Sequence, residues 1–549
     1  MAKKMAKDKK PQPPLLYTKG WKEEKAVYKE QVIPEYGGHP LIEALPPIWS
    51  EEEVIERLSY FPRFSEAERD LPSEIRLHII ENSRELFVVQ GIHLAIEVKI
   101  SRMLRRGLIR RNPSQWHYWT ELDSRIAEIT RSLEKGMFLQ TKARGCAVIG
   151  IGGVGKSTAV ENVFLQYPQV ITHTKYRNTD FIFNHLVWLK LDCPQDGSAR
   201  SLCVNFFRAV DEILGTDYET RYVRERSSAS TLLPQMARVA ALHCIGVLAI
   251  DEVQNLSEAA SGGASQLINF LVQLENTIGV PVILIATDEA QHIFCGKFHH
   301  ARRLSEQGDV IWNPMEERVR KTESEIEEDR KANPSGTVEL WKPDPVWEEF
   351  VRALWDYQYV RKPTPLKDNL LEDELSRTLH KYSFGITALA SAIYMLAQER
   401  AIRTRRETIT KQIIESVGQD SLGLIQEFTE RHRLRGTHKI FRRAAQARNT
   451  GGSNAAKLAA DNRPAEVGSS SGNATEPQPD NKKGRQNAPP ASPGKGRSRA
   501  RKPSPVIKDA EDIRGLEAAI SAGTPTHEAF KNAGHIRASN EFLKGATME

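Results

Sequence analysis

The sequence predicts an α/β fold with a doubly wound parallel sheet. Apolar runs typical of buried strands occur at residues 146–149, 185–192, 246–250 and 280–287. Strands that are covered on both faces consist of such continuous apolar runs, as in parallel sheets. Segments with helical spacing separate the runs, for example residues 201–214, where apolar side chains recur every three or four positions. This alternation of strands and helices indicates a sheet with helices on both faces.

The first run leads into the motif Gly150-x-x-x-x-Gly155-Lys156-Ser157, which has the pattern of a P-loop. Glycines reach backbone angles that a Cβ forbids, and they let amide N–H groups close on phosphate oxygens. The lysine adds a point charge for the β- and γ-phosphates, and the serine hydroxyl is a ligand for Mg²⁺. An ordinary glycine-rich turn is the alternative, but the Lys-Ser pair after an apolar strand favours a nucleoside triphosphate site. Its predicted residues are Gly150, Gly152, Gly153, Val154, Gly155, Lys156, Ser157 and Thr158.

Two acids, Asp251 and Glu252, follow the apolar run at 246–250. We expect Asp251 to hold Mg²⁺ together with Ser157, as strand-end carboxylates do in P-loop enzymes. We expect Glu252 to orient and deprotonate the water that attacks the γ-phosphate. A polar turn is the alternative for such a pair, and the P-loop upstream disfavours it. The predicted cofactors are therefore ATP and Mg²⁺.

Three further residues are candidates for catalysis. Thr287 ends the last apolar run, where its hydroxyl can sense the γ-phosphate or position water. Arg302 and Arg303 lie beyond that strand, at the place from which an arginine of a ring-forming ATPase reaches into the neighbouring subunit's site. A surface ion pair is the alternative for either arginine.

The composition excludes several classes of protein. The 549 residues have a net charge of +6, with 40% apolar and 27% charged residues, which is ordinary for a soluble protein. No apolar run is long enough to span a bilayer, and no signal-peptide segment follows the basic start, so a cytoplasmic protein without membrane contact is expected. The cysteines show no Cys-x-x-Cys pair, which favours buried thiols over disulfides or zinc. They are Cys146, Cys193, Cys203, Cys244 and Cys295.

Changes in composition divide the chain into seven parts. Trp347, Phe350 and Leu354 share one helix face and predict a small helical domain, whereas residues 482–502 contain eight Lys or Arg and no acid. The parts are an extended arm (1–45), a helical N-terminal region (46–139), the α/β core (140–315), a charged connector (316–343), a helical lid domain (344–443), a disordered basic linker (444–506) and a short C-terminal docking segment (507–549).

Several segments together resemble one family of ATPases. The match extends beyond the P-loop to Leu189-Lys-Leu-Asp-Cys193, Asn205-Phe-Phe-Arg-Ala209 and Ile250-Asp-Glu-Val-Gln254. These segments resemble the AAA+ ATPases of the TnsC/TniB type, which are target-selection regulators of cut-and-paste transposons related to the bacteriophage Mu B protein. The resemblance covers about residues 85–315, is weak in the lid and is absent from the tail.

The resemblance implies a bacterial protein that assembles on double-stranded DNA as a homo-oligomeric ring or filament, hexameric or heptameric. The assembly would receive a signal from a TnsD/TniQ-like target selector and then recruit and activate transposase subunits. It also implies roles for single residues. Asp251 and Glu252 become the Walker B pair, Thr287 the first sensor, and Arg302 or Arg303 the finger that acts in trans.

One departure from the family pattern concerns the lid. Residues 386–390 follow Gly385, where a sensor-two arginine is expected, and none of them is an arginine. Slow hydrolysis, stimulated by DNA or a partner, is therefore expected. The candidates for contacts with DNA phosphates are basic residues between the two Walker motifs, namely Lys175, Arg177, Arg200, Arg221 and Arg224.

Three alternatives remain at the sequence level. A loader or remodeller for another DNA machine, such as a helicase, has the same fold. A signalling switch of the STAND type oligomerises with ATP and needs no DNA. A nucleotide-gated scaffold hardly hydrolyses ATP. No nuclease constellation occurs in the chain, so any DNA cutting is expected to belong to a partner.

Overall fold

The computed structural model describes residues 23–135, 145–257, 267, 270–271, 274–290, 308–332 and 339–420. The chain divides into two compact units, and all described residues belong to the first, Met1–Arg435 with Ile507–Glu549. Residues 1–22 of the expected arm, Arg302, Arg303, the expected linker at 444–506 and the expected docking segment at 507–549 lie outside the described residues.

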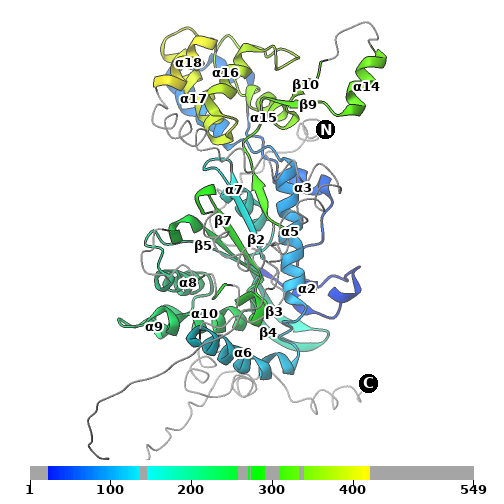
Figure 1. Cartoon of the computed structure of the whole chain (residues 1–549), viewed down its shortest axis with the longest axis vertical. Helices are drawn as coiled ribbons and strands as arrows, with labels where there is room; N and C mark the ends of the chain where they lie inside the picture. The colour runs from blue at the N-terminus through cyan, green and yellow to red at the C-terminus, as the bar shows by residue number, and fades with distance from the viewer. Residues whose placement is uncertain are drawn as a thin grey trace, which may run out of the picture. The chain divides into compact units, whose positions relative to one another are not determined.

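The core of the fold is a parallel sheet of five strands (Figure 1). Its order is β5-β6-β7-β2-β8, and every neighbouring pair is parallel. All residues of β2, β6 and β7 are buried, as expected for strands covered on both faces. The strands are β2 (Cys146–Gly150), β5 (Trp188–Asp192), β6 (Val247–Asp251), β7 (Val282–Ala286) and β8 (Val310–Trp312).

Helices flank this sheet in two groups (Figure 1). In one group, α5 (Gly91–Leu108) packs against α7 (Lys156–Phe164) and against β6 and β8. In the other, α8 (Ala199–Leu214) packs against β5 and α10 (Ala229–Leu242), which in turn packs against α6 (Trp116–Lys135). The predicted doubly wound α/β fold is therefore confirmed.

The strand predicted at 185–192 is wrong as a single element. His185 and Leu186 end β4 (Thr179–Leu186), and β5 begins only at Trp188. The strand β4 forms an antiparallel hairpin with β3 (Val170–Tyr176), because Arg177 and Asn178 adopt positive φ angles of 47° and 63° and form a tight turn.

The described part of the stretch expected to be an extended arm, residues 23–45, contains regular secondary structure. Its strand β1 (Glu23–Lys25) pairs in parallel with β3. The short helix α2 (Pro40–Glu43) buries Leu41 and Ile42 completely. Tyr28 lies over the hairpin, where its hydroxyl is 2.9 Å from Nδ1 of His173.

The described part of the lid contains four helices, in agreement with the helical domain that the periodicity predicts. They are α15 (Pro345–Trp355), α16 (Glu374–Ser383), α17 (Thr387–Arg403) and α18 (Lys411–Asp420). Trp347, Phe350 and Leu354 lie in their shared apolar core. The same core includes Ile80 and Val88 from the N-terminal region. Part of the N-terminal region therefore packs with the lid, although about 260 residues of sequence separate them.

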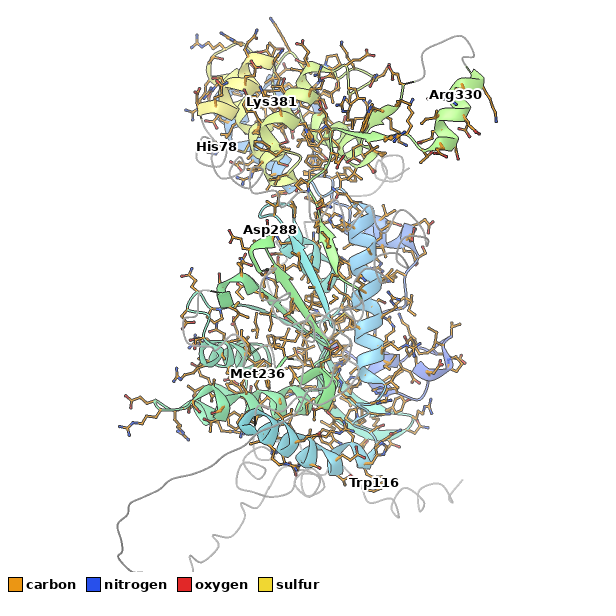
Figure 2. All side chains as sticks on the ribbon, in the orientation of Figure 1. His78, Trp116, Met236, Asp288, Arg330 and Lys381 are labelled. Carbon is orange, nitrogen blue, oxygen red and sulfur yellow. The ribbon has the colours of Figure 1, made fainter. Side chains whose placement is uncertain are left out.

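The remaining elements are short. The expected connector contains β9 (Arg318–Arg320) and β10 (Trp341–Pro343), which pair antiparallel, and α14 (Glu323–Ala332). Asp288, which follows β7, marks the sheet edge at which the carboxyl ends of the strands lie (Figure 2). Among the described residues, the other short helices are α3 (Glu51–Leu58), α4 (Ser73–Ile79), α9 (Tyr218–Tyr222), five 3₁₀ turns at Pro34–Tyr36, Glu66–Asp70, Ile80–Glu85, Val253–Ser257 and Asp288–Ala290, and a π-helical turn at Leu274–Ile278.

Among the described helices, none combines the length and the apolar character needed to cross a membrane. The four described cysteines are buried free thiols, as predicted, and Cys295 lies outside the described residues.

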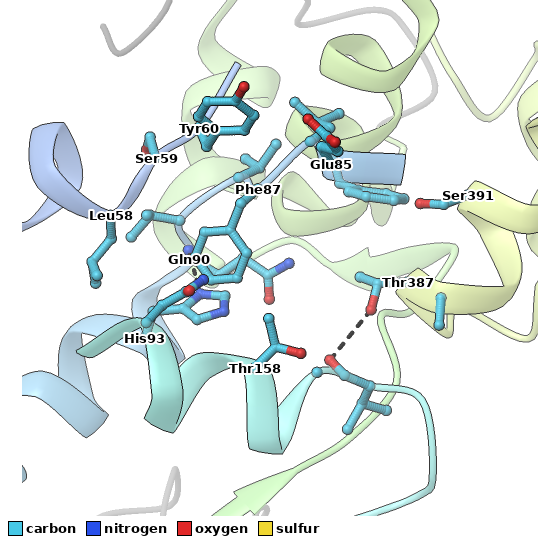
Figure 3. A pocket seen from close by; sticks show the side chains of 18 of the residues that line it. Leu58, Ser59, Tyr60, Glu85, Phe87, Gln90, His93, Thr158, Thr387 and Ser391 are labelled. Carbon is cyan, nitrogen blue, oxygen red and sulfur yellow. Dashed lines mark hydrogen bonds between the residues drawn. The ribbon is translucent and has the colours of Figure 1, made fainter. Parts of the chain in front are cut away.

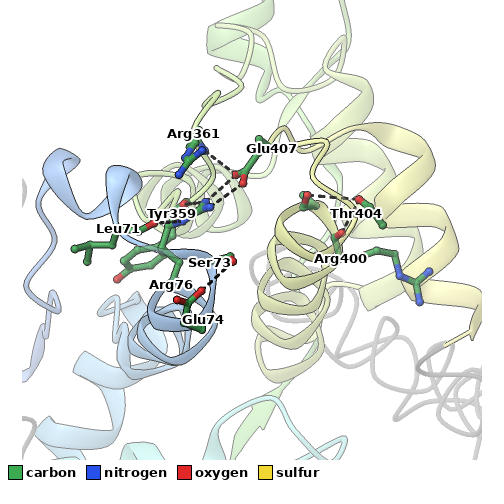
Figure 4. Close-up of polar contacts among 10 residues, drawn as sticks. Leu71, Ser73, Glu74, Arg76, Tyr359, Arg361, Arg400, Thr404 and Glu407 are labelled. Atoms are coloured by element: carbon green, nitrogen blue, oxygen red, sulfur yellow. Dashed lines mark hydrogen bonds and ion pairs between the residues drawn. The ribbon is translucent and has the colours of Figure 1, made fainter.

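A buried ion pair joins the N-terminal region to the lid (Figure 4). Arg76 of α4 is 1% exposed and forms two 2.7 Å hydrogen bonds with the carboxylate of Glu407. Its remaining donors reach the carbonyl oxygens of Leu71 and Tyr359. Because all these acceptors lose their partner together, we expect Arg76→Met to lower the free energy of unfolding of this part by about 3 kcal/mol.

Urea denaturation measures this loss. The matched control is Arg84→Met, since Arg84 pairs with Glu81 at 3.5 Å on the exposed surface. We expect the control to change stability by less than about 0.5 kcal/mol. Equal effects of the two substitutions would contradict the prediction.

Buried histidines predict a loss of stability in mild acid. Burial lowers the pKa of His39 to about 4 and that of His173 to about 3. Between pH 6.5 and pH 4 the unfolded chain therefore binds more protons than the folded chain, and stability falls as the pH falls. Each of these two histidines should lower the free energy of unfolding by about 2 kcal/mol between pH 7 and pH 5.

Denaturation at both pH values tests this dependence. His173→Gln should reduce the difference in stability between pH 7 and pH 5, whereas His117→Gln, at an exposed position, should leave it as in the unsubstituted chain. A pH dependence that is unchanged in His173→Gln would refute the prediction.

Candidate nucleotide-binding site

The P-loop connects β2 to α7, as the sequence predicts. Gly153 and Gly155 have φ angles of +84° and +105°, which side chains with a Cβ rarely adopt. Gly155 is also the N-cap of α7 and provides no side-chain cap. The first N–H groups of α7 are therefore not capped by that residue, and the positive end of the helix faces the loop.

Lys156 lies folded over this loop. Its Nζ donates hydrogen bonds to the carbonyl oxygens of Gly150 at 2.8 Å and Ile151 at 2.9 Å. Burial lowers the pKa of Lys156, and the charges of Asp251 and Glu252 counteract this shift. The ammonium is thus held within the loop, where it can exchange carbonyl oxygens for phosphate oxygens.

The two acids lie at the end of β6, which is separated from β2 by one strand, β7. Asp251 ends β6 and is 4% exposed, and its Oδ1 accepts a 2.9 Å hydrogen bond from the backbone N–H of Glu252. Glu252 has a φ angle of +55°, in the left-handed region that a residue other than glycine seldom adopts. Such backbone conformations cluster at functional sites, where the surrounding structure holds them.

Gln254 connects the acids to the predicted sensor. Its Nε2 donates to the carboxylate of Glu252, and its Oε1 accepts a 3.1 Å hydrogen bond from the backbone N–H of Thr287. The hydroxyl oxygen of Thr287 is buried and has no hydrogen-bond partner among the described residues. An orphaned hydroxyl at this place is available for a phosphate oxygen or for the attacking water.

Sequence reasoning did not identify Lys190. Its Nζ is 3.0 Å from Oδ2 of Asp251 and 2.8 Å from Oε1 of Glu161. Burial lowers its pKa, but the hydrogen bond to Glu161 and the charge of Asp251 outweigh burial and raise the pKa above its ordinary value. The sequence feature that could have indicated its role is a lysine within the apolar strand β5, which lies next to β6, the strand that ends in Asp251.

One cavity of about 2000 Å³ joins these parts (Figure 3). It is lined by Asp251, Glu252, Thr287 and all the predicted P-loop residues except Gly150. The N-terminal region contributes Phe87, Gln90 and His93, and the lid contributes Thr387 and Ser391. The hydroxyl of Thr387 donates to the carbonyl oxygens of Gly153 and Val154, both at 3.3 Å (Figure 3). The sequence did not predict that the N-terminal region and the lid line the cavity, because the residues concerned lie far apart in the chain.

The residues present fit ATP with Mg²⁺. The glycine cradle, the start of α7 and Lys156 suit a triphosphate, and the orphaned Thr287 hydroxyl suits its γ end. Ser157 and Asp251 would be the oxygen ligands for the metal. Within the described residues no group of three or more His, Cys, Asp or Glu side chains is placed to hold a metal ion.

The predicted DNA contacts fall into two places. Lys175 and Arg177 lie on the β3–β4 hairpin, and Arg177 pairs with Glu43 at 3.4 Å. The other three lie around α9, where Arg200 donates to the carbonyl oxygens of Ser227 and Arg224, and Arg221 pairs with Asp217. Lys175 and Arg224 are exposed, and no described residue pairs with either side chain.

Comparison with known proteins agrees with this geometry. Residues 140–294 match the family model of an AAA domain, and none of the curated proteins compared with the chain matches it. Among solved structures, the chain is similar to a Walker-type ATPase of Pyrococcus abyssi, with 14% identity, a TM-score of 0.27, and 59% of this chain and 78% of that chain covered.

Two other similar structures are those of proteins named ORC. The ORC2 protein of Aeropyrum pernix, in complexes with ADPNP and ADP, has 11% identity and a TM-score of 0.30, over 55% of this chain and 67% of that one. The Drosophila ORC bound to DNA has 14% identity and a TM-score of 0.26, with 58% of this chain and 66% of that chain covered. The family match at residues 140–294 agrees with an AAA domain that contains the P-loop, and this class of domain implies nucleotide binding and ATP hydrolysis.

The position of Glu252 makes a prediction about catalysis. We expect Glu252→Gln to slow ATP hydrolysis by about 10²-fold or more, because a general base contributes that much. Affinity for ATP should remain, since the P-loop is unchanged, and Lys156→Ala should lose it. Phosphate release and the binding of a fluorescent ATP analogue measure the two effects. Hydrolysis at the unsubstituted rate in Glu252→Gln would exclude Glu252 as the base.

Proposed function

We propose that the chain is an ATPase that assembles on double-stranded DNA and regulates transposition, as proteins of the TnsC/TniB type do. In this function it receives the signal of a TnsD/TniQ-like target selector and recruits the transposase. The observation that carries the ATPase part is the single cavity in which the P-loop, Asp251, Glu252 and Thr287 meet.

The segments that carry the family resemblance support the finer assignment. Lys190 pairs with Asp251, the backbone N–H of Cys193 donates to the carbonyl oxygen of Asp251 at 2.8 Å, and Gln254 contacts Glu252. A P-loop site in general requires none of these three residues. The resemblance therefore rests on residues that surround the two acids, and not on the glycine loop alone.

Assembly provides the part of the site that one chain lacks. Either Arg302 or Arg303 would enter the site of a neighbouring subunit in a ring or filament and stabilise the charge of the transition state. In the lid, Thr387 touches the P-loop where a sensor-two arginine is absent. Hydrolysis in this proposal is slow and depends on DNA or a partner, so that ATP binding sets the time spent on DNA.

Binding to a labelled DNA duplex over a salt series tests the DNA part. With a non-hydrolysable ATP analogue we expect tighter binding than without nucleotide, and a steep fall of affinity with salt. Lys175→Ala and Arg224→Ala should each reduce the slope of log K against log salt by about 1, because each removes one phosphate contact.

Arg330→Ala is the matched control, since Arg330 is an exposed arginine on α14 outside the candidate set. It should leave the slope unchanged. DNA that neither binds nor stimulates ATP hydrolysis would refute the proposal and favour the signalling switch. Unchanged slopes in both test variants would remove Lys175 and Arg224 from the DNA contacts.

A further inference from the structure

Lys190 lies between the P-loop helix and the strand that ends in Asp251. Its Nζ is 2.8 Å from Oε1 of Glu161, 3.0 Å from Oδ2 of Asp251 and 3.2 Å from Oδ1 of Asp192. An ammonium group has three donors, so these three carboxylates occupy all of them. The side chain is 17% exposed, and solvent therefore screens these contacts less than it would at the surface.

The register of the sheet explains this placement. Asp192 pairs with Asp251 and Lys190 pairs with Ala249, so these side chains point to one face of β5 and β6. The P-loop helix α7 covers that face, because Phe164 of α7 stacks on Trp188 with ring centroids 5.1 Å apart. Glu161, one helical turn before Phe164, then reaches the ammonium from α7.

These contacts fix the carboxylate of Asp251. Its Oδ1 accepts from the backbone N–H of Glu252, and its Oδ2 contacts Lys190. Rotation of this buried carboxylate would break both contacts. Without Lys190, the negative charges of Asp251, Glu161 and Asp192 would lie close together without the one cation that all three share.

We infer that Lys190 is a positioning residue of the nucleotide site, which fixes Asp251 and offsets its charge so that Mg²⁺ binds with ATP and not by itself. This inference rests on the proposed ATPase function. Lys190 touches neither nucleotide nor metal in this role and acts through Asp251. A cation near a metal ligand lowers the attraction of that ligand for a free divalent ion, because like charges repel.

The first measurement is the affinity for Mg²⁺ alone, by calorimetry without nucleotide. Lys190→Met makes the site one charge more negative, so we expect Mg²⁺ to bind about tenfold more tightly. Lys190→Gln removes the same charge but keeps a hydrogen-bond donor, and it should show the same change if Lys190→Met does not fold. Lys190→Arg keeps the charge and should keep the weak affinity.

The second measurement is the turnover of ATP at saturating Mg²⁺. We expect Lys190→Met to lower kcat about tenfold, because Asp251 loses its fixed orientation, with KM for ATP near that of the unsubstituted chain. Lys190→Arg should recover most of kcat. The matched control is Lys321→Met, since the Lys321 side chain is 18% exposed and pairs with Asp329 outside the site. It should change neither value.

Two results would overturn the inference. One is an unchanged affinity for Mg²⁺ alone in both neutral variants, which would leave Lys190 as a structural link between α7 and β6. The other is a Lys190→Met variant with the kcat of the unsubstituted chain. Failure of the proposed function has a different signature, namely no ATP binding or hydrolysis by the unsubstituted chain, and the Mg²⁺ measurement still decides the role of Lys190 in that case.

Discussion

Parallel pairing of β6, β7 and β2 is the constraint on which the site depends. Parallel strands bring their carboxyl ends to the same edge of a sheet, so the residues that follow each strand meet there. In this order the P-loop follows β2, Thr287 follows β7 and Asp251 ends β6. The strand β7 lies between the other two and places the predicted sensor between the phosphate loop and the acids.

Charge is concentrated at this edge and is balanced locally. Lys156 is buried and Lys190 is partly buried, and each contacts oxygen atoms of the protein. Glu252 keeps a left-handed backbone conformation, and Gln254 joins its carboxylate to the backbone of Thr287. The acids are thus held by Lys190 of β5 and by Gln254 of the turn after β6, and Gln254 is itself bonded to Thr287 after β7. A preorganised site for phosphoryl transfer needs such fixed groups.

The walls of the cavity come from parts that are remote in the chain. Residues between α3 and α5 pack into the lid core, and Arg76 and Glu407 tie this segment to the lid. The same segment contributes Phe87 and Gln90 to the cavity, and the lid contributes Thr387. The lid and this segment therefore pack together and line two walls of the same cavity.

The sequence by itself determined the α/β class, the P-loop, the two acids and the lid helices, because each depends on local pattern. Continuous apolar runs predict buried strands, and the glycine spacing identifies a P-loop within a stretch of eight residues. The break between β4 and β5, the partners of Lys190 and the packing of Ile80 with the lid were decided only by the tertiary structure. The hairpin turn at Arg177 lacks the glycine that would mark it. The contacts of Lys190 with Glu161 and Asp251, and of Ile80 with the lid, join residues dozens to hundreds of positions apart, so no periodicity in the sequence predicts them.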